Sequence, residues 1–176
     1  MRWTVHGERI VYDSEWVRLA LADVELPDGE RFEHHVVRIP RPAAATVVRD
    51  PDRGVLLLWR HRFIVDAWGW EIPGGEIEDG ERAEDAARRE TIEETGWRPR
   101  ELQALGSYHP FVGRSDHTFH VFLAEGADRV GDPTSPEAER VDWMPVADVR
   151  RLLRDGDLVD GYSLTALAWA FLRDEL

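Results

Sequence analysis

Three glutamates stand close together near the middle of the chain, in residues 89–94, which read RETIEE. An alanine-rich stretch precedes them and a glycine follows, so we expect one helix over residues 83–95. Glu90 and Glu94 are four residues apart and would share a face of that helix, with Glu93 beside them. Unpaired carboxylates at this spacing repel one another, whereas a hard divalent cation binds them. The segment therefore predicts either a metal site or a solvated acidic helix with Glu–Arg pairs.

The joint spacing of these residues resembles the Nudix box. The matching positions are Gly75, Glu81, Arg89, Glu90, Glu93, Glu94, Gly96 and Trp97. Thr91 stands where the family has Leu, Ile or Val, which changes a packing contact and leaves the ligands intact. The resemblance implies an α+β fold, a Nudix α/β/α sandwich with a mixed β-sheet and an N-terminal β-hairpin extension.

Length and composition agree with an enzyme of this size. The chain has 176 residues, with 43% hydrophobic and 32% charged residues, as expected of a globular protein. A net charge of −13 argues against a nucleic-acid partner, and the absence of cysteine excludes disulfides and thiol chemistry. We find no membrane-spanning stretch and no signal-peptide core, so we expect a cytoplasmic protein.

The N-terminal residues 1–42 predict a β-rich extension ahead of a Nudix domain at residues 43–176. Residues 16–26 and 32–39 predict two strands, with a turn at Pro27-Asp28-Gly29 between them. In Nudix enzymes that act on ADP-ribose-like substrates, such a region often packs across a dimer. The resemblance therefore implies a homodimer.

Two further segments resemble the ADP-ribose and nucleoside diphosphate sugar pyrophosphatase group of the family. Residues 60–63, RHRF, and the EIPGG that begins at Glu71 resemble that group's R-Q-Y-R and E-L-P-A-G. The comparison implies that Arg62 and Glu71 bind substrate. A salt bridge between Arg62 and Glu71 is an equally good expectation from the residues themselves.

The segment at residues 109–117, HPFVGRSDH, resembles the P-x-x-G-x-S-D-E loop of the same group. The comparison implies that Pro110 and Gly113 contact the substrate. His117 stands in place of the expected glutamate.

Glu137 and Glu139 lie just before a predicted strand at residues 140–144. The resemblance implies that Glu137 is the general base and Glu139 a metal ligand; an exposed acidic loop is the alternative. The full expected metal set is Gly74, through its carbonyl, with Glu90, Glu94 and Glu139. Mg²⁺ is the expected ion, with Mn²⁺ able to substitute.

Glu93 and Arg89 complete the expected catalytic group. Arg89 would pair with a carboxylate of the box and fix its rotamer. Further along, residues 146–154 predict a helix, and Ser163 is the expected N-cap of a last helix over residues 164–173.

Taken together, these residues predict magnesium-dependent hydrolysis of a diphosphate linkage. The substrate would be a small molecule, a nucleoside diphosphate joined to another moiety of the ADP-ribose or sugar type, and the products a nucleoside monophosphate and a phosphorylated remainder. Two alternatives remain. One is a house-cleaning pyrophosphatase of nucleoside triphosphates, and the other is a non-catalytic Nudix regulator that binds a ligand.

Overall fold

The computed structural model describes all 176 residues. The chain forms two compact units. The first unit joins residues 1–42 to residues 109–118, and the second joins residues 43–108 to residues 119–176. None of the helices combines the length and apolar character needed to cross a bilayer.

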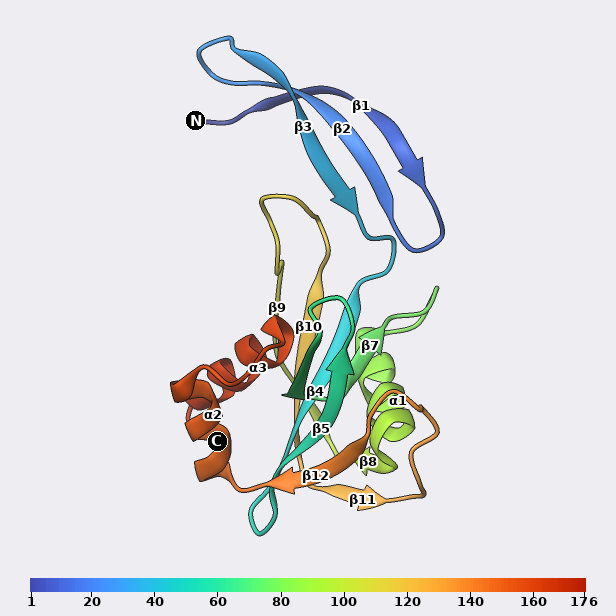
Figure 1. Cartoon of the computed structure of the whole chain (residues 1–176), viewed down its shortest axis with the longest axis vertical. Helices are drawn as coiled ribbons and strands as arrows, with labels where there is room; N and C mark the ends of the chain where they lie inside the picture. The colour runs from blue at the N-terminus through green and yellow to red at the C-terminus, as the bar shows by residue number, and fades with distance from the viewer. The chain divides into compact units, whose positions relative to one another are not determined.

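The first unit is a three-stranded antiparallel sheet in the order β1-β2-β3 (Figure 1). Its strands are β1 (Thr4–Asp13), β2 (Arg18–Glu25) and β3 (Arg31–Arg38). The expected hairpin is β2–β3, with Gly29 in its turn at a φ of 91°. Strand β1 was not expected, because all of its residues are exposed and its apolar residues do not alternate with polar ones.

Residues 109–118 belong to this first unit although they lie far along the chain. The backbone N–H of Val37 donates to the carbonyl of Arg114 at 2.7 Å. Arg38 Nη1 donates to Asp116 Oδ2 at 2.9 Å. The loop is therefore fixed along β3 by both backbone and side-chain contacts.

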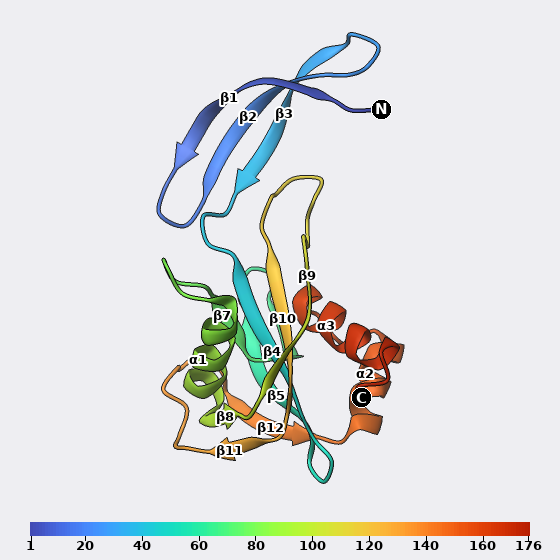
Figure 2. The ribbon, with the colours of Figure 1, turned by 180° about the vertical axis from the view of Figure 1, so that it is seen from behind.

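The second unit is built on a seven-stranded sheet whose main path runs β12-β5-β4-β10-β9 (Figure 2). Strands β4 and β10 pair in parallel and the other neighbours are antiparallel, so the sheet is mixed. Strand β6 pairs with β5, and β7 pairs with β4. The bounds are β4 (Ala43–Asp50), β5 (Gly54–Arg62), β6 (Ala67–Glu71), β7 (Gly74–Glu76), β9 (Leu102–Tyr108), β10 (Phe119–Glu125) and β12 (Arg140–Met144).

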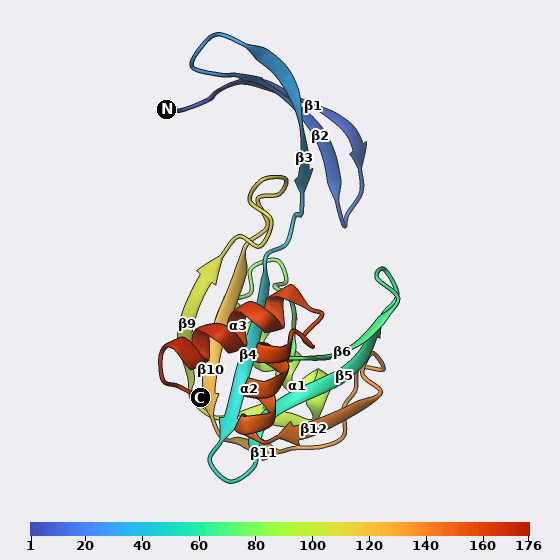
Figure 3. The ribbon, with the colours of Figure 1, turned by 60° about the vertical axis from the view of Figure 1, so that its left-hand side comes forward.

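Helices cover both faces of this sheet (Figure 3). On one face, Ala44 of β4 packs with Ala86 and Ala87 of α1 (Ala83–Thr95). On the other face, Val47 and Leu57 share a core with α2 (Val146–Asp155) and α3 (Gly161–Leu172). Successive strand residues point to opposite faces, so one strand supplies both layers. The predicted α/β/α sandwich with a mixed sheet is confirmed.

The C-terminal end of α1 is closed by the chain that follows it. Gly96 caps the helix at a φ of 73°, and its carbonyl accepts from the backbone N–H of Val130 at 2.9 Å. The N–H groups of Thr134 and Ser135 donate to the carbonyl of Glu93 at 2.8 and 3.0 Å. A short two-stranded sheet, β8 (Trp97–Pro99) with β11 (Ala127–Arg129), supports this closure. The segment leading to Glu137 is thereby anchored on α1.

The last helix begins three residues earlier than expected, and its N-cap is Asp160 rather than Ser163. The carboxylate of Asp160 accepts from the backbone N–H of Ser163 at 2.8 Å. The Ser163 side chain is buried and its hydroxyl oxygen accepts from the N–H of Ile72 at 3.0 Å. Ser163 therefore joins α3 to the end of β6, while the stronger acceptor, Asp160, caps the helix.

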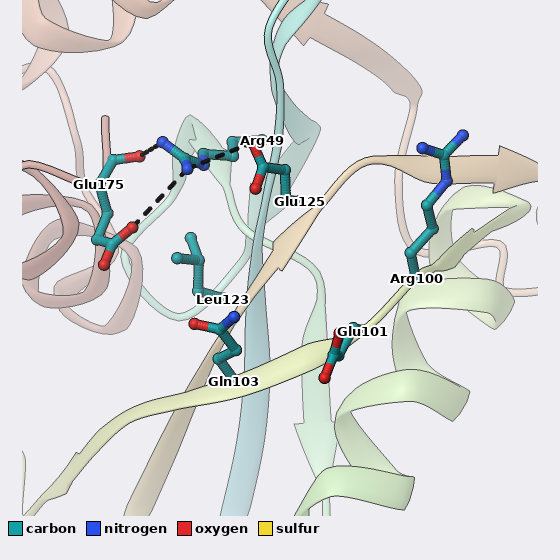
Figure 4. A pocket seen from close by; sticks show the side chains of 7 residues that line it. All are labelled: Arg49, Arg100, Glu101, Gln103, Leu123, Glu125 and Glu175. Carbon is teal, nitrogen blue, oxygen red and sulfur yellow. Dashed lines mark hydrogen bonds and ion pairs between the residues drawn. The ribbon is translucent and has the colours of Figure 1, made fainter.

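The C-terminus is tied to the sheet through Arg49 of β4 (Figure 4). Its Nη1 donates to the carbonyl of Glu175 at 2.5 Å, and its Nη2 lies 3.4 Å from Glu125 Oε1. Leu123 and Gln103 line the same hollow. Arg49 thus links the end of the chain to strands β4 and β10.

Candidate active site

Helix α1 carries the three glutamates of the box, and they differ in burial. Glu94 is only 4% exposed as a residue. The side chains of Glu90 and Glu93 are 16% and 45% exposed. The cluster thus runs from the sheet side of the helix, where Glu94 lies, out to solvent at Glu93.

Thr91, the position that departs from the family pattern, faces inward on the same helix. Its hydroxyl donates to the carbonyl of Ala87 at 2.7 Å and lies 3.1 Å from the hydroxyl of Thr46 on β4. The buried hydroxyl is therefore satisfied. This explains how a polar residue occupies a position that is apolar in the family.

Two glycines of β7 bring backbone against the glutamates. The N–H of Gly74 donates to Glu94 Oε2 at 2.8 Å. A Cβ atom on Gly75 would lie 2.5 Å from the carboxyl carbon of Glu90, so a larger residue there would displace that carboxylate. The predicted role of the Gly74 carbonyl as a metal ligand stays a prediction; what the structure shows is its N–H bond to Glu94.

Arg89 holds the outer part of the cluster. Its Nε and Nη2 donate to the two oxygens of Glu81 at 2.9 and 3.0 Å, and its Nη1 donates to Glu90 Oε1 at 2.6 Å. Nη1 also reaches Glu93 Oε2 at 3.3 Å, and Nη2 donates to the Glu76 carbonyl at 3.0 Å. The hydrogen bonds between Arg89 and Glu81 are the largest cause of two pKa shifts. They raise the pKa of Arg89 and lower the pKa of Glu81. Arg89 therefore connects α1 to the segment that precedes it.

Arg60 of β5 holds the inner part, and it is 2% exposed. Its Nη2 donates to Glu94 Oε1 at 2.5 Å, and its Nη1 donates to Glu137 Oε2 at 3.0 Å. Its Nε lies 3.6 Å from Glu71 Oε2. No role was predicted for Arg60 from the sequence. Its position two residues before Arg62 could have predicted a role at the same site, because residues two apart on a strand share a face.

Arg62 and Glu71, the two residues predicted to bind substrate around β5 and β6, bind each other. Arg62 Nε and Nη2 donate to the two oxygens of Glu71 at 2.9 and 2.6 Å. Glu71 is 3% exposed, while the Arg62 side chain is 48% exposed. The pair has the two-pronged geometry of strong Arg–carboxylate contacts. The salt-bridge expectation is met, and substrate binding by either residue stays a prediction.

The remaining predicted residues fall into two groups. Glu137 is brought to the cluster through Arg60, with a side chain that is 61% exposed. Glu139 follows it with an exposed side chain, while its backbone N–H donates to the carbonyl of Trp59 at 2.9 Å. Pro110 and Gly113 are exposed residues of the first unit, and their role stays a prediction.

Burial changes the proton affinity of two of the glutamates. Desolvation raises the pKa of Glu94 to about 7, against the opposing effects of Arg60 and of the Gly74 N–H. Desolvation also raises the pKa of Glu90, with Arg89 opposing it and repulsion from Glu93 and Glu137 adding to it. These carboxylates are thus close enough to disfavour one another's charge.

This donor set fits a hard divalent cation in its chemistry. Carboxylate oxygens are the ligands that Mg²⁺ and similar ions prefer, and Glu90, Glu93 and Glu94 present them from one helix. In the structure, however, no three acidic or histidine side chains stand together as a ready metal-binding group. Arg60 and Arg89 bind Glu94 and Glu90 instead.

Comparison with known proteins places the chain in a family. The NUDIX domain model matches residues 39–167, so the chain belongs to the Nudix family, and its homologues make it a Nudix hydrolase. Residues 3–37 match the model described as the nucleoside diphosphate sugar hydrolase N-terminal domain.

Individual relatives agree with that assignment. The chain is 49% identical over 160 residues to a CMP-5'-(N-acetyl-N-hydroxy-3-aminopropyl)phosphonate hydrolase of Streptomyces rubellomurinus, covering 90% of this chain and 77% of that protein. It is 29% identical over 176 residues to an ADP-ribose pyrophosphatase of Bacillus subtilis, covering 98% and 94%. A crystal structure of an ADP compounds hydrolase shares the fold, with a TM-score of 0.85 at 21% identity over 99% of this chain and 96% of that one.

The raised pKa of Glu94 predicts how stability depends on pH in metal-free protein. The folded-state pKa of about 7 lies above the ordinary value of 4.5, so the folded state binds more protons between those values. The stabilisation that comes from protonated Glu94 is fully present below about pH 4.5. It is lost as the pH rises through about 7, which lowers the free energy of unfolding by roughly 3 kcal/mol. Denaturant titrations in EDTA at pH 5 and pH 8 measure it.

Glu94→Gln is the matched control, because glutamine keeps the acceptor and loses the titration. We expect the wild type to lose stability relative to Glu94→Gln between pH 5 and pH 8. Parallel curves for the two proteins would contradict the raised pKa.

Proposed function

We propose that this Nudix hydrolase cleaves the diphosphate linkage of a nucleoside diphosphate joined to a further group, in a reaction that depends on a divalent cation. The observation that carries the proposal is the buried carboxylate cluster of Glu90 and Glu94, set against the glycine backbone of β7. The match of residues 3–37 to a nucleoside diphosphate sugar hydrolase N-terminal domain supports the substrate class. Two relatives are named as an ADP-ribose pyrophosphatase and as a hydrolase of a CMP-linked phosphonate, and both names also support this substrate class.

Glu90, Glu93 and Glu94 would hold the ion, together with the carbonyl of Gly74 and Glu139. Mg²⁺ is the proposed ion and Mn²⁺ a substitute. When bound, such an ion supplies positive charge that offsets the diphosphate and lowers the pKa of a coordinated water.

Glu137 is the proposed general base. Arg60 binds its Oε2, which leaves Oε1 to accept the proton of the attacking water. The water oxygen forms a bond to one phosphorus, and the bond from that phosphorus to the bridging oxygen breaks. A nucleoside monophosphate and a phosphorylated remainder leave. Arg62, half-exposed beside the cluster, would contact phosphate oxygens.

Residues 1–42 form the proposed dimer element ahead of the Nudix domain at residues 43–176. Strand β1 is exposed along its whole length and carries apolar side chains such as Val5 and Ile10. An edge strand of this kind favours pairing with another chain. We therefore propose that the protein is a cytoplasmic homodimer. Its proposed substrates are small molecules, since a net charge of −13 disfavours binding to nucleic acid.

A substrate panel tests the reaction. ADP-ribose, nucleoside diphosphate sugars, a CMP-linked phosphonate and nucleoside triphosphates are each incubated with Mg²⁺, and the products are separated by chromatography. We expect turnover of at least one diphosphate-linked compound, and a loss of about 100-fold or more in kcat for Glu90→Gln. Glu84→Gln, in the first turn of the same helix, is the control and should keep its rate. Turnover restricted to triphosphates would favour the house-cleaning alternative.

The roles of Glu137 and Glu139 can be separated. We expect Glu137→Gln to lower kcat by about 100-fold while the Mn²⁺ dissociation constant stays nearly the same, because a base is not a ligand. Glu139→Gln should weaken Mn²⁺ binding. Calorimetry and steady-state rates on both variants measure this, and a collapse of metal binding in Glu137→Gln would reverse the two roles.

Light scattering on the full chain tests the dimer. We expect a mass about twice 20.2 kDa. Ile10→Glu should shift the protein toward the monomer, because it buries an unpaired charge in the proposed interface. Val159→Glu, an equally exposed position of the second unit, should leave the mass unchanged. A monomeric wild type would exclude the dimer.

A further inference from the structure

One cation is already present inside the carboxylate cluster: the guanidinium of Arg60. It is surrounded by Glu94 at 2.5 Å, Glu137 at 3.0 Å and Glu71 at 3.6 Å, and its side chain is 3% exposed. A guanidinium does not lose its proton in proteins, so this charge is permanent. It is therefore a fixed part of the electrostatics of the cluster.

Both oxygens of the Glu94 carboxylate already have hydrogen-bond donors. Glu94 Oε2 accepts from the backbone N–H of Gly74 at 2.8 Å, and Oε1 accepts from Arg60 Nη2. The residue is 4% exposed, so water has little access to either oxygen. A divalent cation that binds Oε1 must take the place of the guanidinium or sit against a like charge at short range.

We propose that Arg60 is a resident cation of the site: its guanidinium and the divalent ion are alternative partners of Glu94, and Arg60 must release Glu94 when the ion enters. This inference rests on the proposed metal dependence of the reaction and adds to it a residue that sets metal affinity. Arg60 acts through Glu94 and is thus a positioning residue.

The neighbours of Arg60 make the exchange feasible. Once it leaves Glu94, the guanidinium keeps Glu137 on one side and Glu71 on the other. Glu71 is itself held by Arg62 in a two-pronged contact, so it stays in place. The released charge therefore remains paired in the buried interior, where an unpaired one would be costly.

Arg60→Gln tests the proposal through metal binding rather than activity. Removing a competing charge should lower the Mn²⁺ dissociation constant at least tenfold, measured by electron paramagnetic resonance of free Mn²⁺ or by calorimetry. A residue that only supports the fold would give the opposite sign, because its loss would loosen the ligands and weaken binding. Unchanged or weaker Mn²⁺ binding in Arg60→Gln overturns the proposal.

Two control variants separate the specific contact from the general charge. Arg62→Gln removes an arginine on the same face of β5 that binds Glu71 and does not touch Glu94, so it should change the dissociation constant less than threefold. Arg60→Lys keeps the charge and should stay near the wild type. A tenfold gain in Arg62→Gln as well would replace the specific exchange with a general charge effect.

A second measurement uses the wild-type protein and does not depend on how the variants fold. In crystals soaked with Mn²⁺, we expect anomalous signal at Glu94 and a distance from Arg60 Nη2 to Glu94 Oε1 above 4 Å. Bound Mn²⁺ with that contact unbroken overturns the exchange while leaving the proposed hydrolysis intact. Failure of the wild type both to bind Mn²⁺ and to turn over any substrate overturns the two together.

Discussion

The structure depends on neutralising several carboxylates within a confined, partly dry space. Glu90, Glu93 and Glu94 extend from one helix, and burial raises the pKa of the first and the last. An isolated charge in such a place is far more costly than an exposed one, so each carboxylate must have a partner. Two arginines supply those partners: Arg89 from the helix itself and Arg60 from the sheet.

The fold brings these arginines in from different directions. Arg89 is on α1 and binds Glu81 and Glu76, so it connects the helix to the chain just before it. Arg60 is on β5, whose alternation sends it to the α1 side of the sheet while Leu57 enters the opposite core. The glycines of β7 allow the backbone to lie against Glu90 and Glu94. The site is therefore a junction between one helix, two strands and one loop.

Such an arrangement has a consequence for chemistry. Groups that hold a metal ion in the bound state need other partners without it, or they would repel one another and disturb the fold. In this protein the partners of Glu90 and Glu94 are guanidinium groups, which are permanently charged and form strong contacts with carboxylates. In the proposed metal site, stability without metal and affinity for metal would be linked through the same oxygens.

Much of this could be predicted from the sequence. The helix at residues 83–95, the mixed sheet with helices on both faces and the Nudix family were predicted and confirmed, because they depend on local propensity, periodicity and a dense motif. Strand β1 was missed because it buries no face, and the N-cap of α3 was misplaced because Asp160 competed with Ser163. These are errors of local pattern.

The partners of the charged groups were settled only by tertiary structure. The sequence by itself determined which acidic residues share a helix and which family the chain belongs to, since both follow from spacing along the chain. Only the packed fold decided that Glu94 bonds to Arg60 and Gly74, and that Arg62 bonds to Glu71. The physical reason is that the partner of a buried charge depends on which strands and helices enclose it, and residues such as Arg60 and Glu137 are far apart in the sequence.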